Sequence, residues 1–293
     1  MRIAITGANA GIGLRATARL AAAGHDVIAL CRSVDRGAAA VTAAGVDPAR
    51  VDVRPLDLAS RSSVQQAAAA LVDDGPLDAL IQNAAVFDQS MTSAQYTDEG
   101  HEVVWATNHL GAVELLARTS EALAASDAPR VVFVASKGLL AMPGIAIRFD
   151  ALDSADWYTP TRAYYHAKLA QVMTAVSLAE SAGDRVAVSC LRVPAVQLDA
   201  DRVASQPALL RRLYALKRMA SVPPEDVAAV YADLVLEDRR RAPDEVYVDE
   251  KRRPVALPRS ARDADQRARL WAVTAEAIGD PQWAWPTVAA PAA

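Results

Sequence analysis

The chain has 293 residues, of which 52% are hydrophobic and 23% charged, so it is long and apolar enough to bury a complete core. Its formal net charge of -4, without a long run of lysines or arginines, argues against nucleic acid as a partner. The two cysteines, Cys31 and Cys190, stand in apolar runs away from histidine, so the sequence predicts neither a disulfide framework nor a metal site.

The amino-terminal sequence and the hydropathy pattern indicate the compartment. Met1 leads directly into a short apolar run, without the pattern of a secretory signal. No stretch reaches the roughly 18 apolar residues that a membrane span requires. We therefore expect no membrane span and a cytoplasmic location, where unpaired cysteines stay reduced.

Seven short apolar runs alternate with longer, alanine-rich segments of helical spacing. The runs are residues 2–6, 26–31, 51–58, 77–85, 130–136, 185–191 and 245–248. Such an alternation predicts an α/β fold, with a single Rossmann-type, doubly wound parallel sheet of about seven strands and helices on both faces. Right-handed crossovers place a ligand at the carboxyl ends of the strands.

The domain is expected to span residues 1–279. Residues 199–226 interrupt the alternation with an apolar, helix-like segment, for which a substrate lid over the sheet edge and another packed helix are the two interpretations. Residues 280–293 are rich in proline and alanine and are predicted to form a tail.

The first predicted strand leads into TGANAGIG, residues 6–13, which opens the first predicted helix. In this context Gly7 permits the tight turn, Gly11 lets the backbone approach a pyrophosphate, and Gly13 lets the helix pack on the sheet. The amino end of the helix adds N–H groups and a partial positive charge. A glycine turn without a ligand is the alternative. The residues assigned to the cofactor are Gly7, Asn9, Ala10, Gly11, Ile12 and Gly13.

The end of the second predicted strand indicates which dinucleotide binds. A site that prefers NAD carries an acid about 20 residues beyond the loop, to bind the ribose hydroxyls. Here Cys31 is followed by Arg32 and Ser33, so no carboxylate repels a 2′-phosphate and a guanidinium is present to bind it. The sequence favours NADP(H), and a solvated surface arginine is the alternative.

Asp57 and Leu58 stand at the end of the third predicted strand and are assigned to the cofactor site as well. The carboxylate is able to accept a hydrogen bond from the adenine amino group. The alternative for Asp57 is a cap on the helix that begins near residue 60.

Two adjacent tyrosines, Tyr164 and Tyr165, precede Lys168 in RAYYHAKLAQ. In a helix Tyr164 lies four residues from the lysine and Tyr165 three, so spacing favours the first only modestly. A phenol with a pKa of about 10 is a poor acid–base catalyst at neutral pH, and a nearby ammonium lowers that pKa. Such a pair would let the hydroxyl exchange a proton with a carbonyl or an alcohol.

Further motifs follow in order: QNAAV at 82–86, TNHLG at 107–111, VFVASKG at 132–138 and AYYHAKLA at 163–170. With TGANAGIG and CRS they resemble the short-chain dehydrogenase/reductase family almost end to end. Residues 149–160 and 247–279 resemble specifically its NADP-dependent retinol dehydrogenase-like group and the protochlorophyllide reductase-like relatives.

The resemblance implies a role for each of four residues. Tyr164 would be the general acid/base, and Lys168 its activator and a ligand of the cofactor ribose. Ser136 would donate a hydrogen bond to the substrate oxygen, and Asn108 would hold a water between the lysine and solvent. The alternatives are a strand cap for Ser136 and backbone bonding at a helix kink for Asn108. We interpret His109 and His166 as structural.

Beside the adenosine ribose, the resemblance places Asn83, Ala84 and Ala85, although Ala85 replaces a glycine of the family. The family's proline-glycine pair and following threonine, which hold the nicotinamide carboxamide, are also altered. In LRVPAVQLD, Val193 and Pro194 stand at the first place and Leu198 at the second. Pro194 and Val196 are assigned to the cofactor through their backbone atoms.

These observations predict an NADPH-dependent oxidoreductase, a ketoreductase or alcohol dehydrogenase, for a hydrophobic small molecule such as a secondary metabolite. The apolar residues between Ser136 and Tyr164 favour a bulky substrate, unless they simply fill the core. Reduction of a carbon–carbon double bond is one rival. A regulatory protein that binds NADP(H) without turnover is another, which the Tyr–Lys pair disfavours.

The resemblance also implies a homo-oligomer, a dimer or tetramer formed through paired helices. The carboxyl tail is long enough to cover that surface, so the oligomeric state stays open.

Overall fold

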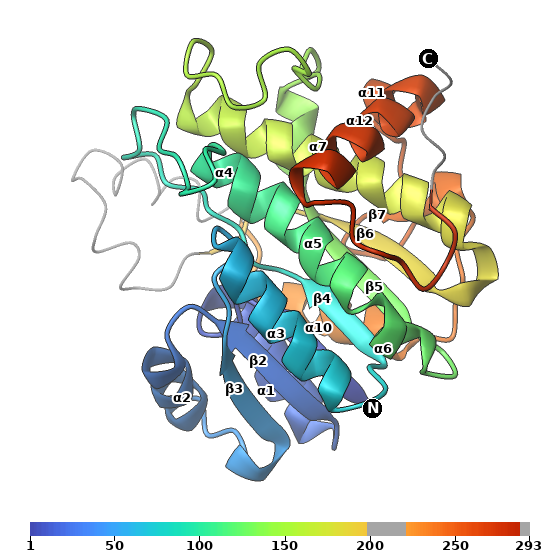
Figure 1. Ribbon diagram of the computed structural model, residues 1–293. Helices are drawn as coiled ribbons and strands as arrows, with labels where there is room; N and C mark the ends of the chain where they lie inside the picture. Colours follow the sequence, from blue (N-terminus) through green and yellow to red (C-terminus); the bar gives the residue numbers. More distant parts are fainter. Residues whose placement is uncertain (198–220, 288–293) are drawn as a thin grey trace.

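The computed structural model describes residues 1–197 and 221–287. Seven parallel strands form one sheet in the order β3-β2-β1-β4-β5-β6-β7, which confirms the predicted doubly wound α/β fold (Figure 1). The strands are β1 (Arg2–Thr6), β2 (Asp26–Cys31), β3 (Val51–Pro55), β4 (Ala79–Gln82), β5 (Arg130–Ser136), β6 (Ala187–Val193) and β7 (Tyr247–Val248).

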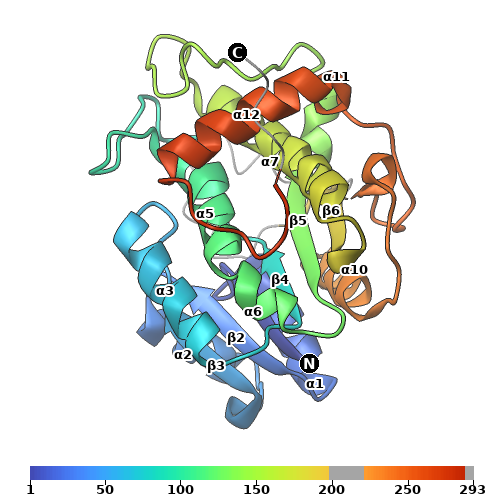
Figure 2. The same ribbon diagram turned by 45° about the vertical axis from the view of Figure 1, so that its right-hand side comes forward.

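Helices cover both faces of the sheet, as its nearly continuous apolar strands require. The helices are α1 (Gly11–Ala22), α2 (Val34–Ala43), α3 (Arg61–Asp73), α4 (Val103–Trp105), α5 (Gly111–Arg118), α6 (Ser120–Ala124), α7 (Pro160–Ala182), α10 (Pro224–Leu236), α11 (Arg259–Arg262) and α12 (Ala264–Ala277). Side chains of α3, α5 and α7 form the core on one face, and those of α1 and α10 on the other. Helix α12 lies outside α7, as Figure 2 shows.

The carboxyl-terminal segment packs on the domain as far as it is described. Trp285 is 4% exposed and belongs to the same core cluster as α7. The N–H of Ala284 donates to Ser120 Oγ at 3.0 Å, and the rings of Trp271 and Trp283 lie 5.2 Å apart. The domain boundary at residue 279 stays a prediction.

Most of the predicted lid, residues 199–226, lies outside the described residues. Its last three residues begin α10, which packs against α1. Within residues 1–197 and 221–287, no helix combines the length and the hydropathy needed to cross a bilayer.

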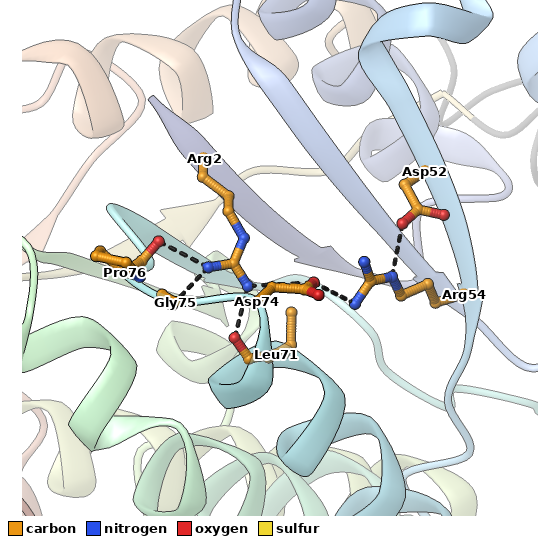
Figure 3. A network of polar contacts seen from close by, with 7 residues as sticks. All are labelled: Arg2, Asp52, Arg54, Leu71, Asp74, Gly75 and Pro76. Carbon is orange, nitrogen blue, oxygen red and sulfur yellow. Dashed lines mark hydrogen bonds and ion pairs between the residues drawn. The ribbon is translucent and has the colours of Figure 1, made fainter.

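A network of paired charges lies at the amino ends of the strands (Figure 3). Arg2, at the start of β1, donates to the carbonyl oxygens of Leu71 and Gly75 at 2.5 and 2.6 Å, so it caps the end of α3. Arg54 binds Asp52 and Asp74 at 2.7 and 2.6 Å. These charges line a cavity of about 610 Å³ at the end of the strands opposite to the predicted site, so the cavity is not part of that site.

Candidate active site

The order of the strands reverses between β1 and β4, which lie side by side with Ile3 opposite Ala79. The glycine loop follows β1, and residues 83–86 follow β4. Their carboxyl ends therefore lie side by side at the switch point of the sheet, where doubly wound sheets bind ligands.

The glycine loop is closed so tightly that Gly13 admits no side chain. A Cβ on Gly13 would lie 2.6 Å from Asn83 Nδ2 and closer still to the carbonyl oxygen of Gly7. Gly7 has a φ of +68° and donates its N–H to Leu30 at 2.8 Å, which ties the loop to the end of β2. The loop is thus folded against both neighbouring strands.

The amino end of α1 has no capping side chain of its own. Its capping residue, Ala10, offers no side-chain hydrogen bond, and no acid lies in the first turn. Gly11 has a φ of +54°, and no atom lies within 4 Å of where its Cβ would stand. Asn9 is half-buried beside the turn, and Ile12 packs partly into the core. The residues present therefore fit a dinucleotide pyrophosphate, because this helix end carries a partial positive charge and its own first turn contains no acid that would repel a phosphate.

Asn83 braces this loop with its side chain. Its Nδ2 donates to the carbonyl oxygens of Thr6 and Gly7 at 2.9 and 3.2 Å. Its Oδ1 accepts from the hydroxyl of Tyr231 at 3.1 Å, and the N–H of Ala84 donates to Thr6 Oγ1 at 3.0 Å. Since the amide is committed, contact with a ribose is left to the backbone of residues 83–85. Tyr231 carries no motif, and sequence reasoning missed it.

The carboxyl ends of β2 and β3 hold the remaining predicted cofactor residues at that side. Arg32 is exposed and forms no ion pair with another described residue, while Ser33 caps α2 by accepting from the N–H of Arg36 at 3.3 Å. Ser33 can therefore still donate its hydroxyl proton. The pair suits a phosphate that reaches beyond the ribose.

Asp57 lies just beyond β3 and does not cap α3. Its Oδ1 accepts from the N–H of Ala59 at 3.0 Å, whereas Ser60 is the capping residue. Leu58 is 6% exposed, so only its backbone is available to a ligand. The carboxylate of Asp57 is thus held in place beyond the carboxyl end of β3 by a local turn.

Tyr164 and Ser136 meet across the carboxyl end of β5. Helix α7 begins at Pro160 behind the capping residue Thr159 and carries Tyr164 in its second turn. The phenol lies near enough to the side chain of Ser136 for that hydroxyl to lower its pKa. Ser136 Oγ accepts from the N–H of Gly138 at 3.1 Å, which leaves its own proton available to donate.

Tyr164 and Tyr165 have different surroundings, which distinguish the candidate catalytic tyrosine more clearly than their spacing from Lys168 does. Tyr165 packs on Gly138, where any Cβ would overlap the phenol ring. Tyr164 faces Ser136, and its ring stacks on Phe87 with a centroid distance of 4.3 Å. Lys168 Nζ lies 5.7 Å from the centroid of the Tyr164 ring. The geometry thus brings together Tyr164, Ser136 and Lys168.

The ammonium group of Lys168 is set into the interface between α7 and the sheet. Lys168 is 1% exposed, and its Nζ donates to the carbonyl oxygen of Val134 at 2.6 Å and to Gln171 Oε1 at 2.9 Å. Burial lowers the pKa of Lys168 to about 8. Burial also raises the pKa of Tyr164, with a smaller contribution from Tyr165, while the nearby side chain of Ser136 lowers this pKa. The lowered phenol pKa expected from the Tyr–Lys pair is therefore not seen, because desolvation dominates.

Asn108 lies in a π-helical segment, Ala106–Leu110, between α4 and α5. It is fully buried, its Oδ1 accepts from the N–H of Val86 at 2.7 Å, and its Nδ2 donates to the carbonyl oxygen of Val86 at 2.9 Å. The side chain thus ties the wide turn to the loop after β4. Both polar atoms of the Asn108 side chain are thus occupied, so the predicted water would have to bind the backbone carbonyl of Asn108. Such π-helical turns are frequent at functional sites.

The altered nicotinamide segment is paired with the chain just before α10. Val196 bridges Val222 in parallel, with bonds from Gln197 N–H to Val222 O at 3.0 Å and from Val222 N–H to Ala195 O at 2.9 Å. In a parallel bridge these bonds use the neighbours of Val196, so its own N–H and C=O face away from Val222. Pro194, which precedes them, is half-buried, and Leu198 lies outside the described residues.

The two histidines that flank the site pack against Trp105. The ring centroids of His109 and His166 lie 4.4 and 4.9 Å from that of Trp105. His109 Nε2 contacts Thr274 Oγ1 at 2.8 Å, and His166 Nε2 accepts from the N–H of Arg148 at 3.0 Å. Neither ring reaches Tyr164 or Ser136 through a hydrogen bond among the described residues.

These histidines make the fold sensitive to acid. Burial, together with His166, lowers the pKa of His109 to about 3, and burial with Arg148 lowers that of His166 to about 4. Between about pH 7.5 and 5.5 the unfolded chain binds protons at both rings and the folded chain does not, so stability falls as pH falls. Urea unfolding across this range should show a loss of about 1 to 3 kcal/mol. His109→Gln and His166→Gln together should flatten the dependence, and a flat wild-type profile would contradict the assignment.

Comparison with known proteins identifies the family to which the chain belongs. A family model described as short chain dehydrogenase matches residues 1–147. Retinol dehydrogenase 12 of Homo sapiens is 32% identical over 281 residues, which cover 94% of this chain and 86% of that protein. Retinol dehydrogenase 14 of Mus musculus is 35% identical over 229 residues, 73% of this chain and 66% of that protein.

Protochlorophyllide reductase A of Hordeum vulgare is 38% identical over 138 residues, 46% of this chain and 36% of that protein. The chain thus matches between about a third and two thirds of the length of the mouse and barley relatives. Among solved structures, an uncharacterized protein from Mycobacterium paratuberculosis has a TM-score of 0.70 and 25% identity, and the match covers 96% of this chain and 94% of that one. A short chain dehydrogenase from Shigella flexneri complexed with NADP shares the fold, with a TM-score of 0.64 and 21% identity over 85% of this chain and 96% of its own.

Proposed function

The chain belongs to the short-chain dehydrogenase/reductase superfamily, in its retinol dehydrogenase-like group, and we propose that this oxidoreductase reduces the carbonyl group of a hydrophobic small molecule with NADPH. The observation that carries the proposal is the grouping of Tyr164, Ser136 and Lys168 at the carboxyl end of β5. Each of the two hydroxyls can donate to a carbonyl oxygen, which needs a proton when its carbon receives a hydride.

The chain's own residues supply positioning and a proton. Ser136, held by the N–H of Gly138, donates a hydrogen bond to the substrate oxygen and orients it. Tyr164 gives its phenolic proton to the same oxygen. Burial raises the pKa of that phenol, so it carries its proton at neutral pH, as a general acid must. NADPH, when bound, supplies the hydride.

The cofactor would be held along the carboxyl ends of the strands. The loop from Gly7 to Gly13 and the amino end of α1 bind the pyrophosphate, and Asp57 accepts from the adenine amino group. Arg32 and Ser33 bind the 2′-phosphate. Lys168 and the backbone of residues 83–85 would bind the two riboses. The backbone of Pro194 and Val196 would bind the nicotinamide carboxamide.

Replacing Arg32 tests the choice of NADPH. Arg32→Ala should weaken NADPH binding by about 10- to 100-fold, because one charge-assisted contact to the 2′-phosphate is lost, and leave NADH binding unchanged. Fluorescence titration with both nucleotides measures this. Arg19→Ala, an exposed arginine at the other end of α1, is the matched control. A wild-type protein that binds NADPH no more tightly than NADH would contradict the role of Arg32.

Two exposed apolar side chains flank the reacting hydroxyls and support an apolar substrate. Phe87 is 41% exposed and stacks on Tyr164, and Leu140 is 62% exposed just beyond Ser136. Other apolar residues of the interval, such as Leu139, pack in the core instead. The substrate class therefore rests on Phe87 and Leu140 rather than on the whole interval.

Reduction of a carbon–carbon double bond is the second candidate, because protochlorophyllide reductases are among the relatives. A conjugated unsaturated ketone separates the two reactions. Loss of the carbonyl with the double bond retained supports the first, and a saturated ketone as product supports the second.

A further inference from the structure

Helix α10 and the residues just before it contact two parts of the proposed dinucleotide site, the nicotinamide segment and the surroundings of the glycine loop. Just before it, Val222 pairs with the nicotinamide segment at Val196. In its first turn, Glu225 Oε1 accepts from Arg15 Nε of α1 at 2.5 Å. One turn and a half further along, Tyr231 reaches Asn83 beside the glycine loop. A single helix of 13 residues thus joins segments that the sequence keeps far apart.

The hydroxyl of Tyr231 satisfies the amide oxygen of Asn83, whose orientation is set by two carbonyl oxygens. The carbonyl oxygens of Thr6 and Gly7 only accept hydrogen bonds, so they require the nitrogen of the amide. The amide oxygen then faces Tyr231, which must donate. With Tyr231 as an acceptor or absent, the oxygen of Asn83 would lose its partner, and a flipped amide would place it against two carbonyl oxygens.

The amide in turn sets the shape of the glycine loop. Asn83 Nδ2 holds the carbonyl oxygens of two successive loop residues, and a Cβ on Gly13 would lie only 2.6 Å from it. The N–H groups of the same two peptide units, from Gly7 and Ala8, donate to the carbonyl oxygen of Leu30 at 2.8 and 3.3 Å, so the turn is held from both sides. Tyr231 itself is 0% exposed and lies behind the loop, so it cannot touch a bound dinucleotide.

We propose that Tyr231 is a positioning residue for NADP(H), which acts through Asn83 on the loop that binds the pyrophosphate. The inference rests on the proposed function, since it takes NADP(H) as the ligand. It assigns Tyr231 to cofactor affinity and not to the chemistry at Tyr164.

Tyr231→Phe removes only the hydroxyl and keeps the buried ring. The Kd for NADPH should rise by about 5- to 15-fold, because a buried hydrogen bond is lost and Asn83 is left unsatisfied. The kcat at saturating NADPH and the KM for the carbonyl substrate should stay within about twofold of wild type. Fluorescence titration and steady-state kinetics measure the three constants. Tyr247→Phe, another buried tyrosine on β7 outside the site, should leave the Kd unchanged.

The outcomes separate the inference from the proposed function. Wild-type protein that binds no NADPH would overturn both. Normal wild-type binding with an unchanged Kd in Tyr231→Phe, whatever its melting temperature, would overturn the role of Tyr231 alone. A fall in kcat with the Kd unchanged would place Tyr231 in the chemistry and would likewise contradict the inference.

Discussion

Tyr164→Phe should lower the kcat of carbonyl reduction by about 10²- to 10⁴-fold, the usual contribution of a positioned general acid, and leave NADPH affinity nearly unchanged. The phenyl ring still stacks on Phe87, so the substitution removes the proton donor and little else. Ser136 alone would then have to stabilise the developing alkoxide. Steady-state NADPH oxidation with a saturating ketone or aldehyde, beside a fluorescence titration, measures both quantities.

Tyr165→Phe is the matched control for this prediction. Its hydroxyl faces Gly138 and not Ser136, so the variant should keep kcat within about threefold of wild type. Full activity in Tyr164→Phe would show that the acid is another group. Loss of activity in Tyr165→Phe with retention in Tyr164→Phe would exchange the two assignments.

Gly13→Ala should weaken NADPH binding by at least about 10-fold, because the loop must open to admit one methyl group. The new Cβ would lie 2.6 Å from Asn83 Nδ2 and nearer still to the carbonyl oxygen of Gly7, and neither is the end of a flexible side chain. Titration with NADPH measures the loss, and circular dichroism checks that the fold is kept.

Gly144→Ala is the control for steric effects, since nothing lies within 4 Å of the Cβ it would add and its φ is not positive. It should bind NADPH as wild type does. Undiminished binding by Gly13→Ala would show that the tight packing of the loop is not needed for the cofactor, and the phosphate site would have to lie elsewhere.

Much of the sheet could be predicted from the sequence because its strands are buried on both faces. The predicted bounds of β1, β2 and β5 agree with the structure, since each is an apolar run between turn residues. β4 is shorter than the predicted run at 77–85. The last residues of that run, 83–85, leave the sheet, and Asn83 braces the glycine loop instead.

β6 and β3 show the limits of the same reasoning. The run at 185–191 begins in a 3₁₀ turn that ends at Arg185, so β6 starts and ends two residues later than predicted. β3 ends at Pro55, which has no N–H to continue the ladder, and Asp57 forms a local turn beyond it. Hydrophobic pattern alone does not contain these local hydrogen bonds.

The ordered motifs led to Tyr164, Ser136 and the glycine loop, which the structure brings to the carboxyl ends of the strands. The partners of those residues were not predictable in the same way. Tyr231 and Asn83 are 148 residues apart, and nothing local marks either as half of a pair. The burial of Lys168 against Val134 likewise depends on how α7 packs on β5.

The altered segment after β6 shows what the sequence could predict there and what it could not. From the sequence, the missing glycine and threonine raised the question of whether Val196 still presents backbone atoms to the nicotinamide. The bridge between Val196 and Val222 leaves the N–H and C=O of Val196 facing away from Val222, so this pairing does not use them. That pairing joins residues separated by the segment around position 210, which no pattern could connect.

The most direct test of the proposed function is the oxidation of NADPH by the wild-type protein in the presence of a panel of hydrophobic aldehydes and ketones. We expect NADPH to be oxidised only when a carbonyl compound is present, with the alcohol as product. This oxidation should be lost in Tyr164→Phe. Binding of NADPH without oxidation across the whole panel, or consumption of only carbon–carbon double bonds, would contradict it.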